Sequence, residues 1–399
     1  MKGTTNLLVL VASLFCLGMN AAPEPQQPWE LQFHLAGSIQ CSFPCHFDAQ
    51  ANLVVQNGNE SLIWTIQDSG NYHLALFDGW IEGSWSTNSE GYTFNGHWID
   101  SLRIPATRIP ITLAQAGETL ASSQILPTNH WDFYFGEGPL VGSLVVNAET
   151  ASATPLLHAS VWTATGDFRY LTGTFRNDSL TLSTFDGSHL YHFQGTLEAD
   201  GILRGTFYNG SQPGRPWHAV PVEDMPGADI GRLTTLPEVP IAFEGIDAQG
   251  KTWTFPSSQG QADLTILDIT ATWCPNCLDA TRLIQELTEA SDASIQCIYL
   301  AFERGAQTQP EKSLQRIARY AQQLHPEGTW LLGGEASKET ARLALPFLPS
   351  VPSFPTVVFI PREGTPEVYT GFYGPATGAA YLQQRAAFES AINRLSHRP

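Results

Sequence analysis

The sequence has few cationic side chains, which limits the partners that the chain can bind. Its 399 residues contain 20 Lys and Arg against 38 Asp and Glu, for a formal net charge of −18 at pH 7. Such an acidic chain repels polyanions, because binding to phosphate backbones or anionic lipids depends on Lys and Arg. We therefore expect neither a nucleic-acid partner nor an anionic membrane surface as a partner.

Long apolar runs are also scarce. The clearest one, from Leu7 to Leu17, is too short to span a bilayer. It follows Lys2 and is followed by small residues, which is the pattern of a secretory signal peptide over residues 1–22. The three residues before Cys16 lack the small-residue pattern of a lipidated cysteine, which argues against a lipid anchor there. The mature chain is predicted to be exported to a periplasm or cell envelope and not to be transmembrane.

Cysteine is rare as well, with six in the chain. Two of them form the C-x-x-C pair Cys274 and Cys277, and no further Cys or His pair with zinc spacing follows. A structural zinc site needs four such ligands. The sequence therefore predicts no metal site and no cofactor beyond a redox-active disulfide.

The C-x-x-C pair lies between a buried strand and a helix. Leu264 to Ile269 is an apolar run typical of a buried strand, and the apolar residues after Cys277 share one helical face. The unpaired N–H groups of the first helical turn would stabilise a Cys274 thiolate, and Cys277 is placed to resolve a mixed disulfide. Pro275 and Asn276 suit the first turn of a helix. This context indicates a redox centre.

Three segments resemble the TlpA/ResA-like thiol–disulfide oxidoreductases of bacterial cell envelopes. They are ATWCPNC (Ala271–Cys277), SFPTVVFI (Ser353–Ile360) and GFYGPATG (Gly371–Gly378). The resemblance covers residues 241–399 and implies an α/β thioredoxin-like fold there. It also implies a protein disulfide reductase whose partners are disulfide-bearing envelope proteins and an upstream electron donor.

The resemblance further implies roles for single residues. Pro355 occupies the position of a cis-proline that faces the disulfide, and Phe354 before it would tune specificity. Asp268, six residues before Cys274, would help to deprotonate Cys277. Trp273 would shield the pair.

Two other functions stay open. One is a thiol peroxidase, against which Ala271 stands where a peroxiredoxin would have threonine. The other is a ligand- or protein-binding envelope protein in which the C-terminal domain is accessory.

The first part of the chain has a different pattern. Short alternating segments separated by turn residues run through residues 23–222 and predict an antiparallel β-sandwich or barrel of unknown ligand. A similar β-rich region precedes the thioredoxin domain in some exported TlpA-like proteins. Residues 223–240 are rich in proline, glycine and acid, and are predicted to form a linker. Downstream, helical patterns cover Glu311–Leu324, Ser337–Leu345 and Ala379–Leu395.

Cys41 and Cys45 lie early in the β-rich part. In an exported protein the default interpretation is a structural disulfide. A second redox pair that relays electrons to Cys274 and Cys277, or a copper site with His46, are the alternatives.

Overall fold

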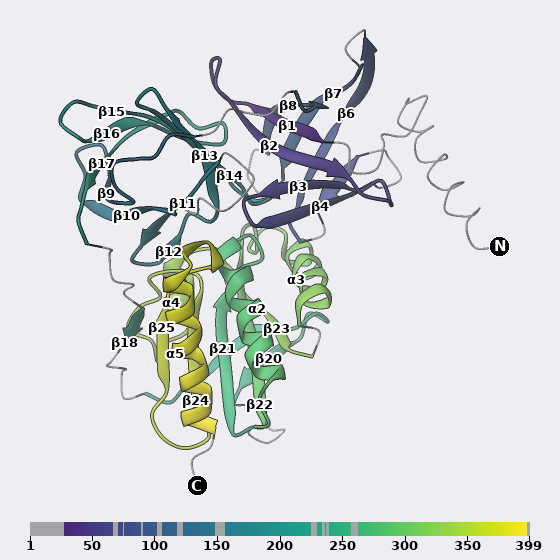
Figure 1. Cartoon of the computed structure of the whole chain (residues 1–399). Helices are drawn as coiled ribbons and strands as arrows, with labels where there is room; N and C mark the ends of the chain where they lie inside the picture. Colours follow the sequence, from purple (N-terminus) through teal and green to yellow (C-terminus); the bar gives the residue numbers. More distant parts are fainter. Residues whose placement is uncertain are drawn as a thin grey trace. The chain divides into compact units, whose positions relative to one another are not determined.

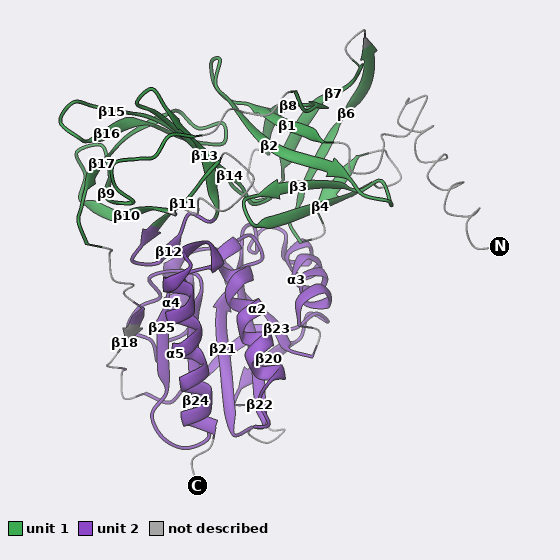
Figure 2. Cartoon of the chain, in the orientation of Figure 1, with its two compact units in different colours: residues 1–161, 170–225 green, residues 162–169, 226–399 purple. Residues whose placement is uncertain are grey.

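The computed structural model describes residues 28–66, 71–74, 76–88, 91–101, 106–117, 123–147, 156–224, 230–233, 236, 239–256, 262–325 and 327–396. The predicted signal peptide lies outside this part. The chain divides into two compact units (Figure 2): unit 1 comprises residues 1–161 and 170–225, and unit 2 comprises residues 162–169 and 226–399. Within the described residues, no helix is long and apolar enough to cross a membrane.

The first eight strands close into an antiparallel barrel in sequence order, because β8 pairs back onto β1 (Figure 1). Side chains alternate between the interior and the outside; on β2 the residues Cys41, Phe43 and Cys45 are buried and those between them are exposed. The strands are β1 (Trp29–His34), β2 (Gln40–Phe47), β3 (Leu53–Asn57), β4 (Glu60–Ile66), β5 (Tyr72–Leu74), β6 (Gly79–Asn88), β7 (Gly91–Asp100) and β8 (Thr107–Gln115).

The next nine strands form a second antiparallel sheet, whose strands β10 and β11 also pair with each other. Closure removes the unpaired backbone groups that sheet edges would expose. The strands are β9 (His130–Phe135), β10 (Leu140–Asn147), β11 (Leu157–Thr163), β12 (Gly166–Asp167), β13 (Leu171–Arg176), β14 (Ser179–Phe185), β15 (Leu190–Leu197), β16 (Leu203–Asn209) and β17 (Arg215–Pro221).

One side chain of the second sheet belongs to the core of the first barrel. Phe185, at the end of β14, is fully buried. Its ring centroid lies 4.6 Å from that of Phe33 and 5.1 Å from that of Trp98. The backbone nitrogen of Phe185 donates to Asn57 Oδ1 at 3.0 Å, and the same oxygen accepts from Thr184 Oγ1. The two sheets of unit 1 are therefore joined by buried contacts.

Unit 2 contains an eight-stranded mixed sheet in the order β18-β25-β24-β21-β22-β23-β19-β20. The central strands β21, β22 and β23 are parallel, and β24 and β25 are antiparallel to their neighbours. The strands are β18 (Gly231–Leu233), β19 (Phe243–Ile246), β20 (Thr252–Phe255), β21 (Leu264–Thr270), β22 (Ile295–Glu303), β23 (Thr329–Glu335), β24 (Thr356–Pro361) and β25 (Glu367–Thr370).

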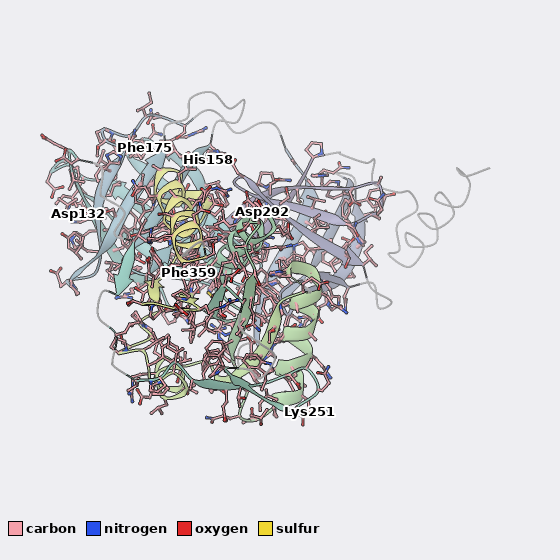
Figure 3. All side chains as sticks on the ribbon, turned by 90° about the horizontal axis from the view of Figure 1, so that it is seen from below. Asp132, His158, Phe175, Lys251, Asp292 and Phe359 are labelled. Carbon is pink, nitrogen blue, oxygen red and sulfur yellow. A yellow bond between two sulfur atoms is a disulfide. The ribbon has the colours of Figure 1, made fainter. Side chains whose placement is uncertain are left out.

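The described part of unit 2 also contains four α-helices and one short 3₁₀ helix. They are α2 (Pro275–Glu289), α3 (Pro310–Leu324), α4 (Lys338–Ala344), η1 (Pro375–Thr377) and α5 (Ala379–Ser396). The helices expected near residues 311, 337 and 379 are confirmed, and Ser337 caps α4 by accepting from Thr340 N at 3.0 Å. Phe359, labelled in Figure 3, is buried on β24 against α5, where its ring lies 5.2 Å from that of Phe388. Lys251, labelled in Figure 3, is exposed in the turn between β19 and the edge strand β20.

Two sequence predictions need correction. A single sandwich or barrel was expected over residues 23–222, whereas the strands build two sheets; alternation predicts strands but not which strands pair. The predicted linker over residues 223–240 contains β18, which pairs with β25. The backbone of that segment thereby covers an edge of the sheet, a role that its composition did not reveal.

Removing the Phe185 ring should weaken unit 1. Phe185→Ala would leave a cavity among aromatic side chains and is expected to cost about 3–5 kcal/mol of unfolding free energy, measured by urea denaturation. Ile125→Ala is the control, because Ile125 is 78% exposed; its effect should stay within about 0.5 kcal/mol. Equal effects of the two substitutions would contradict the core role of Phe185.

Candidate active site

The C-x-x-C pair lies where β21 passes into α2. Every residue of β21 is buried, so the strand fixes the start of the helix within the core. Cys274 is the N-cap of α2, and its sulfur accepts from the Cys277 backbone N–H at 3.2 Å. The two cysteines form a disulfide, with their Cα atoms 5.2 Å apart. Cys274 is 7% exposed and Cys277 is fully buried, so Cys274 is the sulfur that a partner can reach.

A second wall of the site comes from the loop before β24. The Phe354–Pro355 peptide is cis, as the resemblance implies. The carbonyl oxygen of Phe354 lies 3.6 Å from Cys274 Sγ. The Trp273 ring meets the Phe354 ring edge-on at 6.1 Å, and its indole N–H donates to the Phe302 carbonyl at 3.1 Å. The Arg304 guanidinium lies over the Trp273 ring, 4.3 Å from its centre.

The turn before Cys274 is held by a buried carboxylate. Glu303 accepts from both the backbone N–H and the hydroxyl of Thr272, each at 2.8 Å. Arg316 Nε lies 3.4 Å from the same carboxylate. Burial raises the pKa of Glu303, whereas the bonds from Thr272 and Arg316 lower it. The network fixes the backbone one residue before Trp273.

Asp268 lies on β21, behind the helix that carries the cysteines. It is fully buried, and its Oδ2 accepts from the hydroxyl of Thr281, one turn after Cys277 on α2, at 3.2 Å. Its other oxygen has no hydrogen-bond partner in the described part of the chain. Burial raises the pKa of Asp268 to about 8. The carboxyl group can therefore hold or release a proton near neutral pH.

A third wall comes from a segment more than 100 residues earlier, residues 162–169 of unit 2. Arg169 is buried, forms an ion pair with Asp279 on α2, and lies 3.5 Å from the Pro275 carbonyl oxygen. Asp167 accepts from the Gly374 N–H at 2.7 Å, and its backbone carbonyl accepts from the Asn276 side-chain amide at 3.3 Å.

The structure thus brings most of the predicted site residues together. Cys274 and Cys277 share a small apolar cluster with Trp273 and Phe354. Arg169, Asp167, Asp279 and Glu303 also border the site and were not predicted from the sequence. The position of Asp279 in the first turns of α2 was a usable signal, whereas nothing in the sequence links residues 162–169 to the C-x-x-C motif.

The structural disulfide proposed for Cys41 and Cys45 is not formed. Both are buried free thiols that face the interior of the first barrel from one strand. Four residues along a strand span about 13 Å, which is too far for a disulfide. Burial raises the pKa of Cys41 to about 12 and that of Cys45 further, which disfavours thiolate chemistry there.

The copper alternative finds no support at this place. His46 follows Cys45 on the strand and therefore points to the other side of the sheet. Among the described residues, no three His, Cys, Asp or Glu side chains are grouped so that they could hold a metal ion.

Comparisons with known proteins find similar structures but no family. No family model and no curated protein matches the chain. A thioredoxin-like protein from Aeropyrum pernix is 16% identical, over 38% of this chain and 89% of its own, with a TM-score of 0.28. A putative protein disulfide isomerase from Bacteroides thetaiotaomicron is 18% identical, over 42% and 94%, with a TM-score of 0.29. A thioredoxin-family thiol:disulfide interchange protein from Chlorobium tepidum TLS is 18% identical, over 39% and 93%, with a TM-score of 0.26.

The buried Asp268 should make stability depend on pH. Its pKa is raised from 3.8 to about 8, so the folded chain keeps a proton that the unfolded chain loses above pH 4. The stability associated with this proton is complete below pH 4 and is lost as the pH rises to about 8. Asp268→Asn should therefore stabilise the protein increasingly over this range, by up to about 1.4 kcal/mol per pH unit.

Denaturant unfolding of Asp268→Asn at several pH values measures this dependence. Asp263→Asn is the matched control, because the Asp263 side chain is 41% exposed and is paired with Arg362. A difference between Asp268→Asn and the unsubstituted protein that does not change between pH 4 and pH 8 would show that the carboxyl group is not buried as described.

Proposed function

We propose that this chain is an exported, TlpA-like thiol–disulfide oxidoreductase that reduces disulfides of cell-envelope proteins. The observation that carries the proposal is the geometry of Cys274: its sulfur caps α2, is bonded to Cys277, and lies 3.6 Å from the carbonyl before a cis-proline. A thiolate at that place is stabilised by the first-turn N–H groups.

The reaction begins from the reduced pair. The Cys274 thiolate attacks one sulfur of a partner disulfide, so that a mixed disulfide forms and the other partner sulfur leaves as a thiolate. The Cys277 thiolate then attacks Cys274 Sγ, which closes the Cys274–Cys277 disulfide and releases the second partner sulfur. Two electrons pass from the pair to the partner, and a dithiol electron donor must return them.

Asp268 is the proposed proton acceptor for Cys277. Cys277 is fully buried, so its thiol cannot lose its proton directly to solvent. Asp268 is bonded to the same helix one turn later and has a pKa raised to about 8. Its carboxylate form can accept a proton near neutral pH through a water molecule.

The walls of the site suit a sulfur substrate. Trp273 and Phe354 present aromatic surface beside Cys274, the less buried of the two cysteines. Pro355 has no backbone N–H, so it cannot donate a hydrogen bond to a partner. The backbone of the neighbouring Phe354 is the group proposed to dock the partner. The site needs no metal or organic cofactor, because the disulfide itself carries the electrons.

The alternatives make different predictions. A thiol peroxidase would consume peroxide with Cys274 alone as the attacking thiol. A binding protein would keep its ligand or partner when both cysteines are replaced.

Single cysteine substitutions test the proposal. Cys274→Ser should reduce insulin disulfide turnover, with dithiothreitol as donor, to the level without protein, because the attacking thiol is lost. Cys277→Ser should also stop turnover but accumulate a mixed disulfide at Cys274, visible by mass spectrometry under non-reducing conditions.

Cys297→Ser is the control, because Cys297 is a buried free thiol on β22 whose pKa is raised to about 12 by burial. Its turnover should be unchanged. Full turnover by Cys274→Ser, or peroxide consumption in place of disulfide reduction, would contradict the proposed function.

A further inference from the structure

The segment Trp162–Arg169 contacts two other stretches of the chain that border the redox pair. On one side, its Asp167 carbonyl accepts from the Asn276 amide, and Arg169 lies at the Pro275 carbonyl, so it covers the turn inside the C-x-x-C motif. On the other side, the Asp167 carboxylate accepts from the Gly374 N–H at 2.7 Å. The Asn276 amide, the Pro275 carbonyl and the Gly374 N–H are therefore already bonded to the segment.

The contact with the second loop is made by backbone. Gly166 forms a parallel β-bridge with Phe372. Gly371, with φ +77°, lies so close that a Cβ there would be 2.7 Å from the Thr165 carbonyl carbon. An extended peptide could not pair with residues 371–374 while the segment is docked, because that backbone is already covered.

The side chains of the segment add little net charge. The buried ion pair of Arg169 and Asp279 is electrically neutral. Arg282, which lies 3.9 Å from Asp279, adds a positive charge that offsets the negative charge of Asp167. Arg169 and Arg282 thus balance Asp167 and Asp279 along the first turns of α2. Such a set perturbs the Cys274 thiolate much less than an unbalanced charge would. The effect of the segment is therefore on access to the sulfur.

What remains open is the aromatic side. Trp273 and Phe354 are half-buried and line Cys274, with Arg304 beside them. A partner that reaches Cys274 there needs to present its disulfide on a narrow, protruding segment with apolar flanks.

We propose that the segment Trp162–Arg169 selects the partners of the redox pair: by covering Pro275–Asn276 and Gly371–Gly374, it excludes disulfides held in broad or extended protein surfaces and admits small or protruding ones. This inference rests on the proposed oxidoreductase function.

Two substitutions undock the segment in different ways. Asp167→Ala removes the bonds to Gly374 N and to Arg169 N. Gly166→Ala places a methyl group against the Asn276 amide at a φ of +146°, which side chains rarely adopt. Asp200→Ala is the matched control, because Asp200 is exposed and pairs with Arg204 in unit 1.

Undocking is followed by hydrogen–deuterium exchange at the Gly374 amide, which should speed up in both variants and not in the control. Reduction of insulin by the full chain should then rise about tenfold in kcat/KM, because the covered side opens to a protein substrate. The rates with dithiothreitol and glutathione disulfide should stay within about twofold in Gly166→Ala, and its reduction potential should not move, because this variant undocks the segment without changing a charge.

Each other outcome overturns the proposal. Faster amide exchange with unchanged insulin reduction would mean that the segment does not limit access. Parallel changes in the insulin and small-molecule rates of Gly166→Ala, or a shifted potential of that variant, would mean that the segment positions the cysteines instead. Unchanged exchange at Gly374 in both variants would show that these contacts do not hold the segment. If the unsubstituted protein exchanges with neither insulin nor dithiothreitol, the oxidoreductase function itself has failed.

Discussion

The position of one sulfur atom, at the first turn of α2, is the constraint on which the described site depends. Cys274 is placed there because a wholly buried strand runs directly into the helix. Three separate parts of the chain then hold the turn: Glu303 from β22, Phe354 from the loop before β24, and Arg169 from residues 162–169. In the proposed mechanism, a reduced Cys274 held in this orientation would face the first-turn N–H groups of the helix, which stabilise a thiolate.

Buried ionisable groups surround this sulfur, and their partners differ. Arg169 and Asp279 neutralise each other, and Glu303 is bonded to Thr272 and faces Arg316. Asp268 has a single hydrogen bond and a pKa raised to about 8 by burial. Burial also raises the pKa of Glu303, whose carboxylate is bonded to Thr272 and faces Arg316. Asp268 differs in that one of its oxygens has no hydrogen-bond partner among the described residues, which is why the proposed mechanism assigns the proton transfer to it.

The sequence predicted the local parts of this site and not the distant ones. The strand, the C-x-x-C turn and the helix are consecutive, so apolar periodicity and helix-start chemistry were sufficient to place Cys274 and Cys277. Residues 162–169 reach the site through tertiary contacts, which periodicity cannot show. The alternation of buried and exposed residues likewise could not predict how the seventeen strands pair into two sheets. The predicted disulfide between Cys41 and Cys45 was wrong. It rested on the general preference of exported proteins for disulfides, whereas the two residues lie too far apart along one strand to form a bond.

The reduction potential of the Cys274–Cys277 pair tests the central claim most directly. The full chain would be equilibrated in dithiothreitol or glutathione buffers, its free thiols alkylated, and the two oxidation states counted by mass spectrometry. A disulfide reductase predicts a single two-electron transition at these two cysteines near the thioredoxin value of about −270 mV. A value near about −120 mV would make the pair an oxidant of partner thiols. The absence of any transition would contradict a redox function for this site.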